Sequence, residues 1–287
     1  MVVSDTDARI RAIKFVILMG LVSLFADMTY EGARSITGPY LAFLGAGAAV
    51  TGIVAGLGEF IGYGLRVVSG DLADRTGRYW TITLLGYPKE LETNKVQEIR
   101  GALPHIFWIY LVFVAISVAG YPHFQLISYH LSLSPLVSNA QIPVLFAVAM
   151  GVDALAALVV GRLFDRVGLL VLIAAPIAGI PVAPLAFSTS YEMALLGVIF
   201  WGAVMGVQET VMRAAIAGMT PIEKRGSAYG IFNAAYGLSW LLGSAAMGFL
   251  YSMSIAYVIA FSVMLELVSL VWLLGLRRGY GKQRSII

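Results

Sequence analysis

Four polar or charged residues near the N-terminus recur at helical spacing. Asp27, Tyr30, Glu31 and Arg34 occupy positions i, i+3, i+4 and i+7, so they share one face of a helix. Asp27 lies about 20 Å beyond Lys14, which places it near mid-bilayer if this helix spans a membrane. Ionisable groups at such depth are functional by default. We expect Asp27 to carry a proton and Glu31 to pair with Arg34; a structural ion pair between helices is the alternative.

Other apolar segments carry isolated charges that could line a solute path. Glu59 and Arg66 share a face of the segment 48–69, with Tyr63 between them. For Asp153 and Glu209 a role in packing stays an equal alternative, while Glu266 in the last segment is assigned a structural role. The predicted proton-coupling and substrate-path residues are Asp27, Glu31, Arg34, Glu59, Arg66, Asp153, Gln208 and Glu209.

Neither enzymatic nor metal chemistry has a recognisable pattern in the sequence. His105, His123 and His130 are spread along one segment without metal-ligand spacing, and the chain contains no cysteine. Phosphate-cradling loops and the common hydrolase motifs are also absent. We therefore predict no enzyme activity, no metal, no cofactor and no nucleic-acid partner. His123, beside Pro122, is interpreted as a core residue, with a cavity-lining role as the alternative.

The elements that position these residues are membrane helices. Of 287 residues, 59% are hydrophobic and 12% are charged, and the mean hydropathy is +0.85. A soluble domain has about twice that charged share. The sequence predicts an all-α, polytopic membrane protein with about eight transmembrane helices. They are expected at 14–38, 48–69, 105–130, 143–162, 168–187, 191–217, 227–251 and 255–276.

Basic residues indicate how these helices are oriented. With eight spans, every Lys and Arg except Arg34 and Arg66 falls on one side, and the opposite loops, at 39–47, 131–142, 188–190 and 252–254, contain none. By the positive-inside rule the basic side is cytoplasmic. Both termini are therefore predicted to be cytoplasmic, in a plasma-membrane protein. Glycine pairs such as Gly52 and Gly56, Gly58 and Gly62, and Gly202 and Gly206 predict close packing between helices.

A short cytoplasmic motif occurs twice. The sequences Gly70–Gly77 and Gly161–Gly168 share Gly, Leu, Asp, Arg and Gly at the same offsets, and we expect each to form a loop after a membrane helix. Duplicated units of this kind are common in secondary transporters. The glycines would permit a tight reversal, and the aspartates could cap the following helix. An ordinary short loop is the alternative.

The first copy, read as Gly-x-Leu-Ala-Asp-Arg-x-Gly-Arg, resembles the signature loop between the second and third helices of the major facilitator superfamily. The second copy resembles its equivalent in the C-terminal half, and residues 225–248 resemble the eleventh helix. Tyr79 departs from the family pattern, which usually has a basic residue there. The resemblance implies a cytoplasmic latch formed by Gly70, Asp74, Arg75, Gly77, Arg78, Gly161, Asp165, Arg166 and Gly168.

The resemblance also implies that helices are missing, because family members normally have twelve. Residues 1–86 match helices one and two and the start of helix three; residues 87–104 resemble the central cytoplasmic linker. Residues 105–276 match the C-terminal six-helix half, and residues 277–287 form a cytoplasmic tail. The fold is thus predicted to be an incomplete twelve-helix plan that lacks most of helix three and helices four to six.

Two functions follow from this interpretation. The leading prediction is a secondary active transporter of a small organic solute or drug, coupled to protons and working by alternating access in the lipid bilayer. The alternative is a non-transporting truncated remnant or a membrane-embedded packing partner. A second copy of the chain could supply what the short N-terminal half lacks.

Overall fold

The computed structural model describes residues 5–76, 103–221 and 224–280, and all regular elements in these ranges are helical. The side chains of 66–76 and 276–280, and of much of the first helix before residue 25, lie outside the description. The long helices are α1 (Asp5–Phe43), α2 (Ala48–Thr76), α4 (His105–Gly120), α6 (Ile142–Val167), α9 (Tyr191–Val207), α11 (Arg225–Met253) and α12 (Ile255–Tyr280). The short ones are α5 (Phe124–Leu133), η1 (Gly168–Ile173), α7 (Ala174–Gly179), α8 (Val182–Ala186), η2 (Gln208–Met212) and α10 (Arg213–Met219).

Each of the eight predicted spans coincides with one helix or with a broken series of helices. Within the described residues, five segments are long and apolar enough to cross a membrane by length and composition. One of them, Ile142–Ala186, has 45 residues, about twice what one crossing needs, and it reverses at Gly168. The helix α11 is long, but its Gly, Ser, Tyr and Asn residues keep its hydropathy below the same standard.

Proline breaks two of the predicted spans. Pro122 has no backbone N–H, so α4 stops at Gly120, Tyr121 and His123 take extended conformations, and α5 begins at Phe124. The predicted continuous span 105–130 is therefore two helices. The fifth span is divided in the same way into η1, α7 and α8, with Pro181 immediately before α8.

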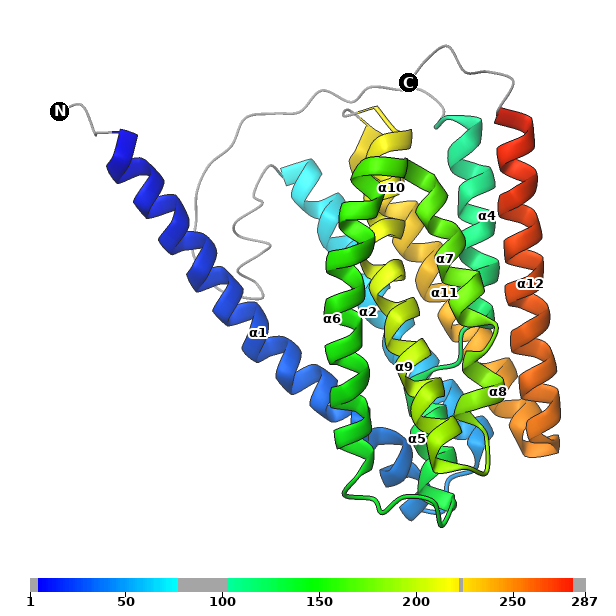
Figure 1. The fold of residues 1–287 in the computed structure, drawn as a ribbon. Coiled ribbons are helices and arrows are strands. Elements are labelled where there is room, and N and C mark those ends of the chain that lie inside the picture. The colour runs from blue at the N-terminus through cyan, green and yellow to red at the C-terminus, as the bar shows by residue number, and fades with distance from the viewer. Residues whose placement is uncertain (1–4, 77–102, 222–223, 281–287) are drawn as a thin grey trace.

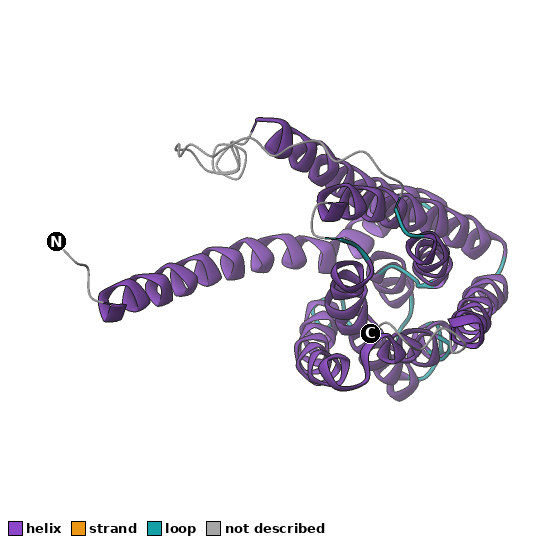
Figure 2. Cartoon of the chain, turned by 90° about the horizontal axis from the view of Figure 1, so that it is seen from above, coloured by secondary structure: helices purple, strands orange, loops and turns teal. Residues whose placement is uncertain are grey.

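The helices α4 to α12 form what we call the C-terminal unit. The first two helices pack mainly on this unit and little on each other. The turn between them includes Gly45, which has a φ of 77°. From there α2 runs along α11, and only the later part of α1 lies on α5. The earlier part of α1 extends away from the bundle, as both views show (Figures 1 and 2).

Small residues set the distance between α2 and α11. A Cβ added to Gly52 would lie 2.3 Å from the Ser244 carbonyl oxygen, and one added to Gly56 would lie 2.8 Å from the Leu241 Cα. The Ser244 hydroxyl donates a hydrogen bond of 2.7 Å to the Gly52 carbonyl. The predicted role of this pair in close packing is confirmed.

The other two glycine pairs have different outcomes. Gly202 and Gly206 on α9 lie against the α6 backbone at Ala149 and Asp153, as predicted. Gly58 and Gly62 have nothing within 4 Å of an added Cβ, so the prediction that they pack closely is wrong for the described part of the chain. Their face of α2 is turned away from α11.

The repeated motif is helical rather than a loop. The helix α2 continues through Gly70, Asp74 and Arg75 to Thr76, and α6 continues through Gly161, Asp165 and Arg166 to Val167. The predicted loop is therefore wrong over these positions, and the aspartates lie in the last turns of a helix instead of capping the next one. The chain reverses only at Gly168, whose φ is 62°. Gly77 and Arg78 lie outside the described residues.

Candidate solute and proton site

An arginine between two carboxylates joins α1 to α2. The Arg34 guanidinium lies 3.0 Å from Oε1 of Glu31 on its own helix and 3.3 Å from Oε1 of Glu59 on α2. Tyr30 donates a hydrogen bond of 2.7 Å to the same Glu59 oxygen. The guanidinium also lies 5.5 Å from the centre of the Tyr30 ring, within cation–π range. We call Tyr30, Glu31, Arg34 and Glu59 the Arg34 cluster.

Arg34 and Glu59 form the buried part of the Arg34 cluster, whereas Tyr30 is 50% exposed. Arg34 is 6% exposed and Glu59 is 9% exposed. A buried charge is tolerated when it is paired and hydrogen-bonded, and here one cation compensates two acids. The cluster therefore carries an excess negative charge unless one acid holds a proton. Nε and Nη2 of Arg34 have no hydrogen-bond partner among the described residues, so the guanidinium has unused donors, although Nη2 lies 3.3 Å from Glu59.

A π-helical turn carries polar side chains on the C-terminal unit. The π-helical turn η2 lies between α9 and α10. Such turns are frequent at functional sites. Gln208 is 1% exposed and accepts a hydrogen bond of 2.8 Å from the Tyr236 hydroxyl on α11. The Tyr236 ring packs against Tyr63 of α2 at 4.8 Å between centroids. A hydrogen bond from α11 to η2 and a ring contact from α11 to α2 thus join these three elements.

The remaining acids on this side are Asp153 on α6 and Glu209 on η2. Oδ1 of Asp153 has no hydrogen-bond partner in the described part of the chain. Arg213 of α10 forms a hydrogen bond with Tyr63 of α2, and the negative charge of Glu209 attracts its guanidinium.

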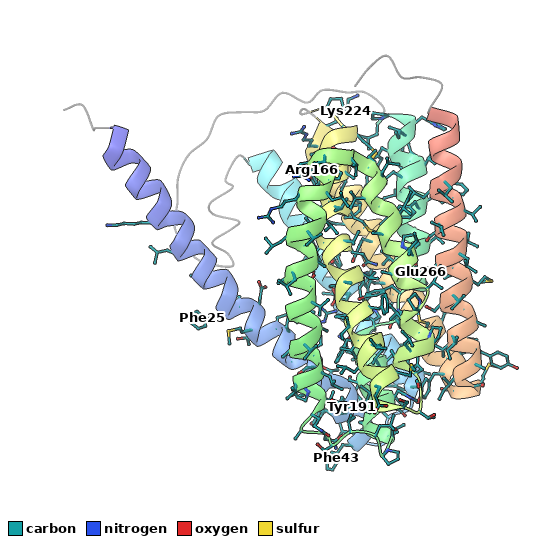
Figure 3. The ribbon with its side chains drawn as sticks, viewed as in Figure 1. Phe25, Phe43, Arg166, Tyr191, Lys224 and Glu266 are labelled. Atoms are coloured by element: carbon teal, nitrogen blue, oxygen red, sulfur yellow. The ribbon has the colours of Figure 1, made fainter. Side chains whose placement is uncertain are left out.

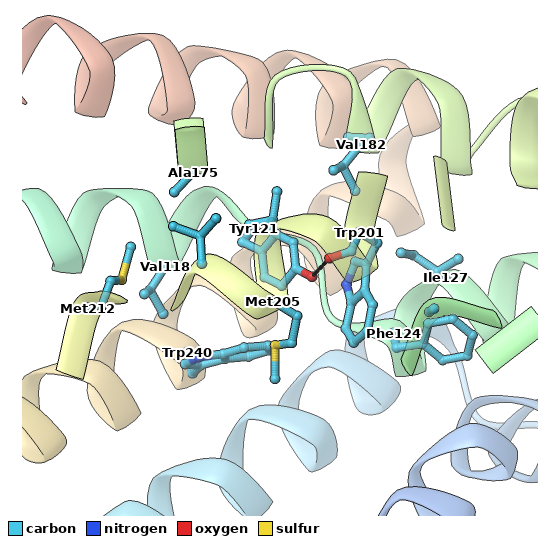
Figure 4. Close-up of a cluster of buried hydrophobic side chains, with 14 of the residues drawn as sticks. Val118, Tyr121, Phe124, Ile127, Ala175, Val182, Trp201, Met205, Met212 and Trp240 are labelled. Atoms are coloured by element: carbon cyan, nitrogen blue, oxygen red, sulfur yellow. Dashed lines mark hydrogen bonds between the residues drawn. The ribbon is translucent and has the colours of Figure 1, made fainter. Parts of the chain in front are cut away.

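Aromatic side chains surround the break between α4 and α5. The His123 ring lies 3.7 Å from the Trp240 ring of α11. Tyr121 donates a hydrogen bond of 2.6 Å to the Trp201 carbonyl, and the Trp201 indole donates one of 2.8 Å to the Pro122 carbonyl. Figure 4 shows Tyr121, Trp201 and Trp240 packed together in the core. The Trp201 indole thus satisfies the Pro122 carbonyl, which the break leaves without a helical partner.

The sequence-predicted residues divide into three groups. Glu31, Arg34 and Glu59 come together in the Arg34 cluster, and Asp153, Gln208 and Glu209 belong to the C-terminal unit. Asp27 is exposed on α1, away from the buried part of the cluster. Arg66 lies on α2, and its side chain is outside the description, so its predicted place on the solute path stays a prediction. Glu59 bonds residues of α1.

Several site residues had no strong signal in the sequence. Tyr30 was placed on the face of Asp27 and Arg34, but its bond to Glu59 requires knowing that α1 and α2 meet there. Tyr236 and Trp240 are separated from α1 by some 200 positions and have no distinguishing motif. Among the described residues, no group of three or more His, Cys, Asp or Glu side chains could hold a metal ion.

The fold and these buried charges define a multi-pass α-helical membrane protein with a polar interface between two helical units. Comparison with known proteins makes the family specific. The family described as the Major Facilitator Superfamily matches residues 103–285, which is more than half of the chain. The chain belongs to this superfamily, whose members are transporters of small molecules and not enzymes.

Longer relatives occur in mycobacteria. A protein of Mycobacterium bovis and one of Mycobacterium tuberculosis, both described as uncharacterized, are each 29% identical to this chain. Each alignment covers 96% of this chain and 96% of the relative, over 391 residues. This length exceeds the 287 residues of the chain by about a hundred. The relatives therefore contain residues inside the aligned region that have no counterpart here.

Proposed function

We propose that this chain is a secondary active transporter that moves a small organic solute or drug by alternating access, driven by a proton gradient. The observation that carries the proposal is the Arg34 cluster, a buried cation between two acids that belong to two helices. When Glu59 takes up a proton, it loses its charge and its attraction to Arg34. The contact between α1 and α2 then weakens, and the guanidinium becomes available to a hydrogen-bond acceptor of the solute.

Asp27 is proposed as the point of proton entry. It lies one helical turn before Glu31 on α1 and is exposed, so a proton can reach it without rearrangement of the bundle. Glu31 and Glu59 then lie successively deeper along the same path. Asp153, Gln208 and Glu209 are proposed to complete the solute path from the C-terminal unit, and Arg66 from α2.

The orientation is proposed from the basic residues. Arg166 and Lys224 lie at the end of the bundle where α1 begins and α12 ends, whereas Phe43 and Tyr191 lie at the opposite end (Figure 3). By the positive-inside rule the first end is cytoplasmic, in the plasma membrane. The latch role of Asp74, Arg75, Asp165 and Arg166 at this end is proposed with it, now with these residues on helix ends.

A second candidate function is favoured by the length of the relatives. We propose that the extra residues of the relatives correspond to most of helix three and helices four to six, lost between the units 1–86 and 105–276. A chain without them would be a non-transporting remnant or packing partner, unless a second copy supplies the missing surface. The extension of α1 away from the bundle supports this reading (Figure 2).

Purified chain in proteoliposomes tests the two candidates. An internal pH-sensitive dye would report proton movement when a panel of organic cations, anions and neutral drugs, including ethidium, is added under an imposed pH gradient. A transporter gives solute-dependent proton flux that Glu59→Gln abolishes and Asp27→Asn reduces at least several-fold. Glu192→Gln, an exposed acid at the start of α9, is the matched control and keeps the flux. Absence of flux across the panel would favour the remnant.

A further inference from the structure

Glu266 is a buried carboxyl group that the proposed transport site does not use. It lies on α12 at mid-height of the bundle (Figure 3) and is 0% exposed. The carboxyl group rests directly on Gly179 of α7, where an added Cβ would lie 2.8 Å from its Cδ. Ser117 of α4 and Ser269 of α12 each place a hydroxyl 3.3 Å from Oε2. Oε1 has no hydrogen-bond partner among the described residues.

No cation from the packed helices faces this group in the described part of the chain. The helices packed on α12 are α4, α7, α8 and α11. Of these, α7 and α8 contain no ionisable residue, and His105 of α4 is exposed at the far end of its helix. Tyr110 of α4 donates to the Met212 carbonyl, and Arg225 of α11 donates to the Ala217 carbonyl.

The other described ionisable groups on these helices form hydrogen bonds with residues other than Glu266 or lie at the ends of their helices. On α11, Tyr229 donates to the Arg213 carbonyl, Tyr236 to Gln208, and Tyr251 is bonded to His130. On α12, Tyr257 is exposed in the first turn. An ionised Glu266 would therefore be a lone buried charge in the membrane interior, which costs several kcal/mol.

The hydroxyl protons near Glu266 can be counted. Ser269 has one proton, and its shorter bond, 2.9 Å, goes to the backbone carbonyl of Glu266 itself. The Ser269 oxygen then faces Oε2 with a lone pair. Two lone pairs at 3.3 Å attract only if a proton lies between them, and the carboxyl group is the remaining source. With this proton on Oε2, the unpartnered Oε1 is a neutral carbonyl oxygen. Burying a neutral carbonyl oxygen without a hydrogen-bond partner costs less free energy than burying a carboxylate oxygen in the same way.

We infer that Glu266, with Ser117, Ser269 and Gly179, forms a second proton-binding site, separate from the Arg34 cluster, that is occupied in this conformation. The proton is held as a carboxylic acid, on Oε2 and toward the Ser269 oxygen. Because α4, α7 and α12 enclose it completely, the proton can leave only when α12 separates from α7 or α4. Proton occupancy of Glu266 and the packing of α12 are therefore linked.

Infrared difference spectroscopy of the full chain in lipid nanodiscs tests this inference independently of transport. At neutral pH the wild-type chain should show the carbonyl stretch of a protonated carboxylic acid, which shifts in D2O and disappears in Glu266→Gln. Ser117→Ala should move this band to higher frequency, because one hydrogen bond to the carboxyl group is lost. Loss of carboxylate bands, instead of the acid band, in Glu266→Gln would overturn the inference.

A matched serine variant and a stability measurement distinguish a proton bound at Glu266 from a general effect of packing around α12. Ser262 is also buried on α12, but its hydroxyl donates to the Gly120 carbonyl at 2.6 Å; Ser262→Ala should leave the acid band where it is. The melting temperature of the wild-type chain should fall on alkaline titration relative to that of Glu266→Gln, which cannot ionise. Equal pH dependence in the two chains would contradict a proton bound at Glu266. If Glu266→Gln does not fold, the Ser117→Ala and Ser262→Ala bands still decide the question.

Discussion

Arg34 on α1 and Glu59 on α2 form a buried ion pair, with Nη2 3.3 Å from Oε1. The two helices otherwise touch little, so this pair and the Tyr30 bond beside it are the main direct link between them. The same residues are the proposed coupling groups. The proposed coupling groups therefore lie at the contact that must change if α2 and α11 are to move relative to α1.

Arg34→Ala should strongly destabilise the chain. It leaves Glu59 buried without its cation, and breaking a buried pair in this way costs about 3–5 kcal/mol. Unfolding of the detergent-solubilised chain, followed by tryptophan fluorescence in denaturant, measures the change. Arg162→Ala is the control, since Arg162 is an exposed residue that bonds only a carbonyl of its own helix; a surface change of this kind is worth about 0.5 kcal/mol or less. Equal effects of the two substitutions would contradict the buried pair.

Combining Arg34→Ala with Glu59→Gln should recover part of the lost stability. The double variant removes both charges, so no unpaired carboxylate is left in the interior. A double-mutant cycle should give a coupling energy of about 1–3 kcal/mol. Additive single effects would show that the two side chains do not interact.

Tyr30→Phe should destabilise the chain by less than Arg34→Ala. The substitution removes the hydroxyl that bonds Glu59, and a hydrogen bond to a charged group contributes about 1.5–3 kcal/mol. Tyr40→Phe, on the same helix at a tyrosine that is 60% exposed, should have almost no effect. The same denaturant titration compares them, and a Tyr30→Phe midpoint equal to that of Tyr40→Phe would exclude the bond.

The sequence predicted the helices well because membrane spans are specified by long apolar runs, which do not depend on tertiary contacts. The sequence predicted one span over 105–130 and did not locate the break at Pro122, because proline inside a membrane helix is compatible with a kink, a break or neither. The Glu31–Arg34 pair was predictable because both residues lie on one helix. The Glu59 contacts were not, since a residue on α2 can face α1, α11 or lipid, and only packing decides.

The repeated motif shows why residue preferences alone did not predict its secondary structure. Its Gly and Asp residues are typical of turns, and this composition favoured two loops. In the structure the preceding helix continues through the described part of both copies, and the added turns keep their backbone N–H and C=O groups hydrogen-bonded within the helix. Single-residue preferences were therefore overridden by the hydrogen bonding of the whole helix.

Gly52→Ala should destabilise the chain, whereas Gly58→Ala should not. Both glycines lie on α2, but only Gly52 contacts α11, where a Cβ would collide with the Ser244 carbonyl oxygen. Overpacking of this kind typically costs about 1–3 kcal/mol. At Gly58 the space is open, and alanine is the better helix former by about 1 kcal/mol. Thermal unfolding in detergent should move the two midpoints in opposite directions; a shared direction would mean that α2 does not pack on α11 through Gly52.

The two glycines of the second motif copy should also respond with opposite signs. Gly168 ends α6 with a φ of 62° and a ψ of −142°, a conformation that costs other residues about 1–3 kcal/mol, so Gly168→Ala should lower stability. Gly161 lies inside α6, where an added Cβ would meet only Thr210 at 3.7 Å, an ordinary contact. Gly161→Ala should therefore raise stability by up to about 1 kcal/mol. Denaturant titration of both variants gives the two signs. If Gly161→Ala were the damaging change, the reversal would lie at the start of the motif, and the helical continuation of α6 through Asp165 would be wrong.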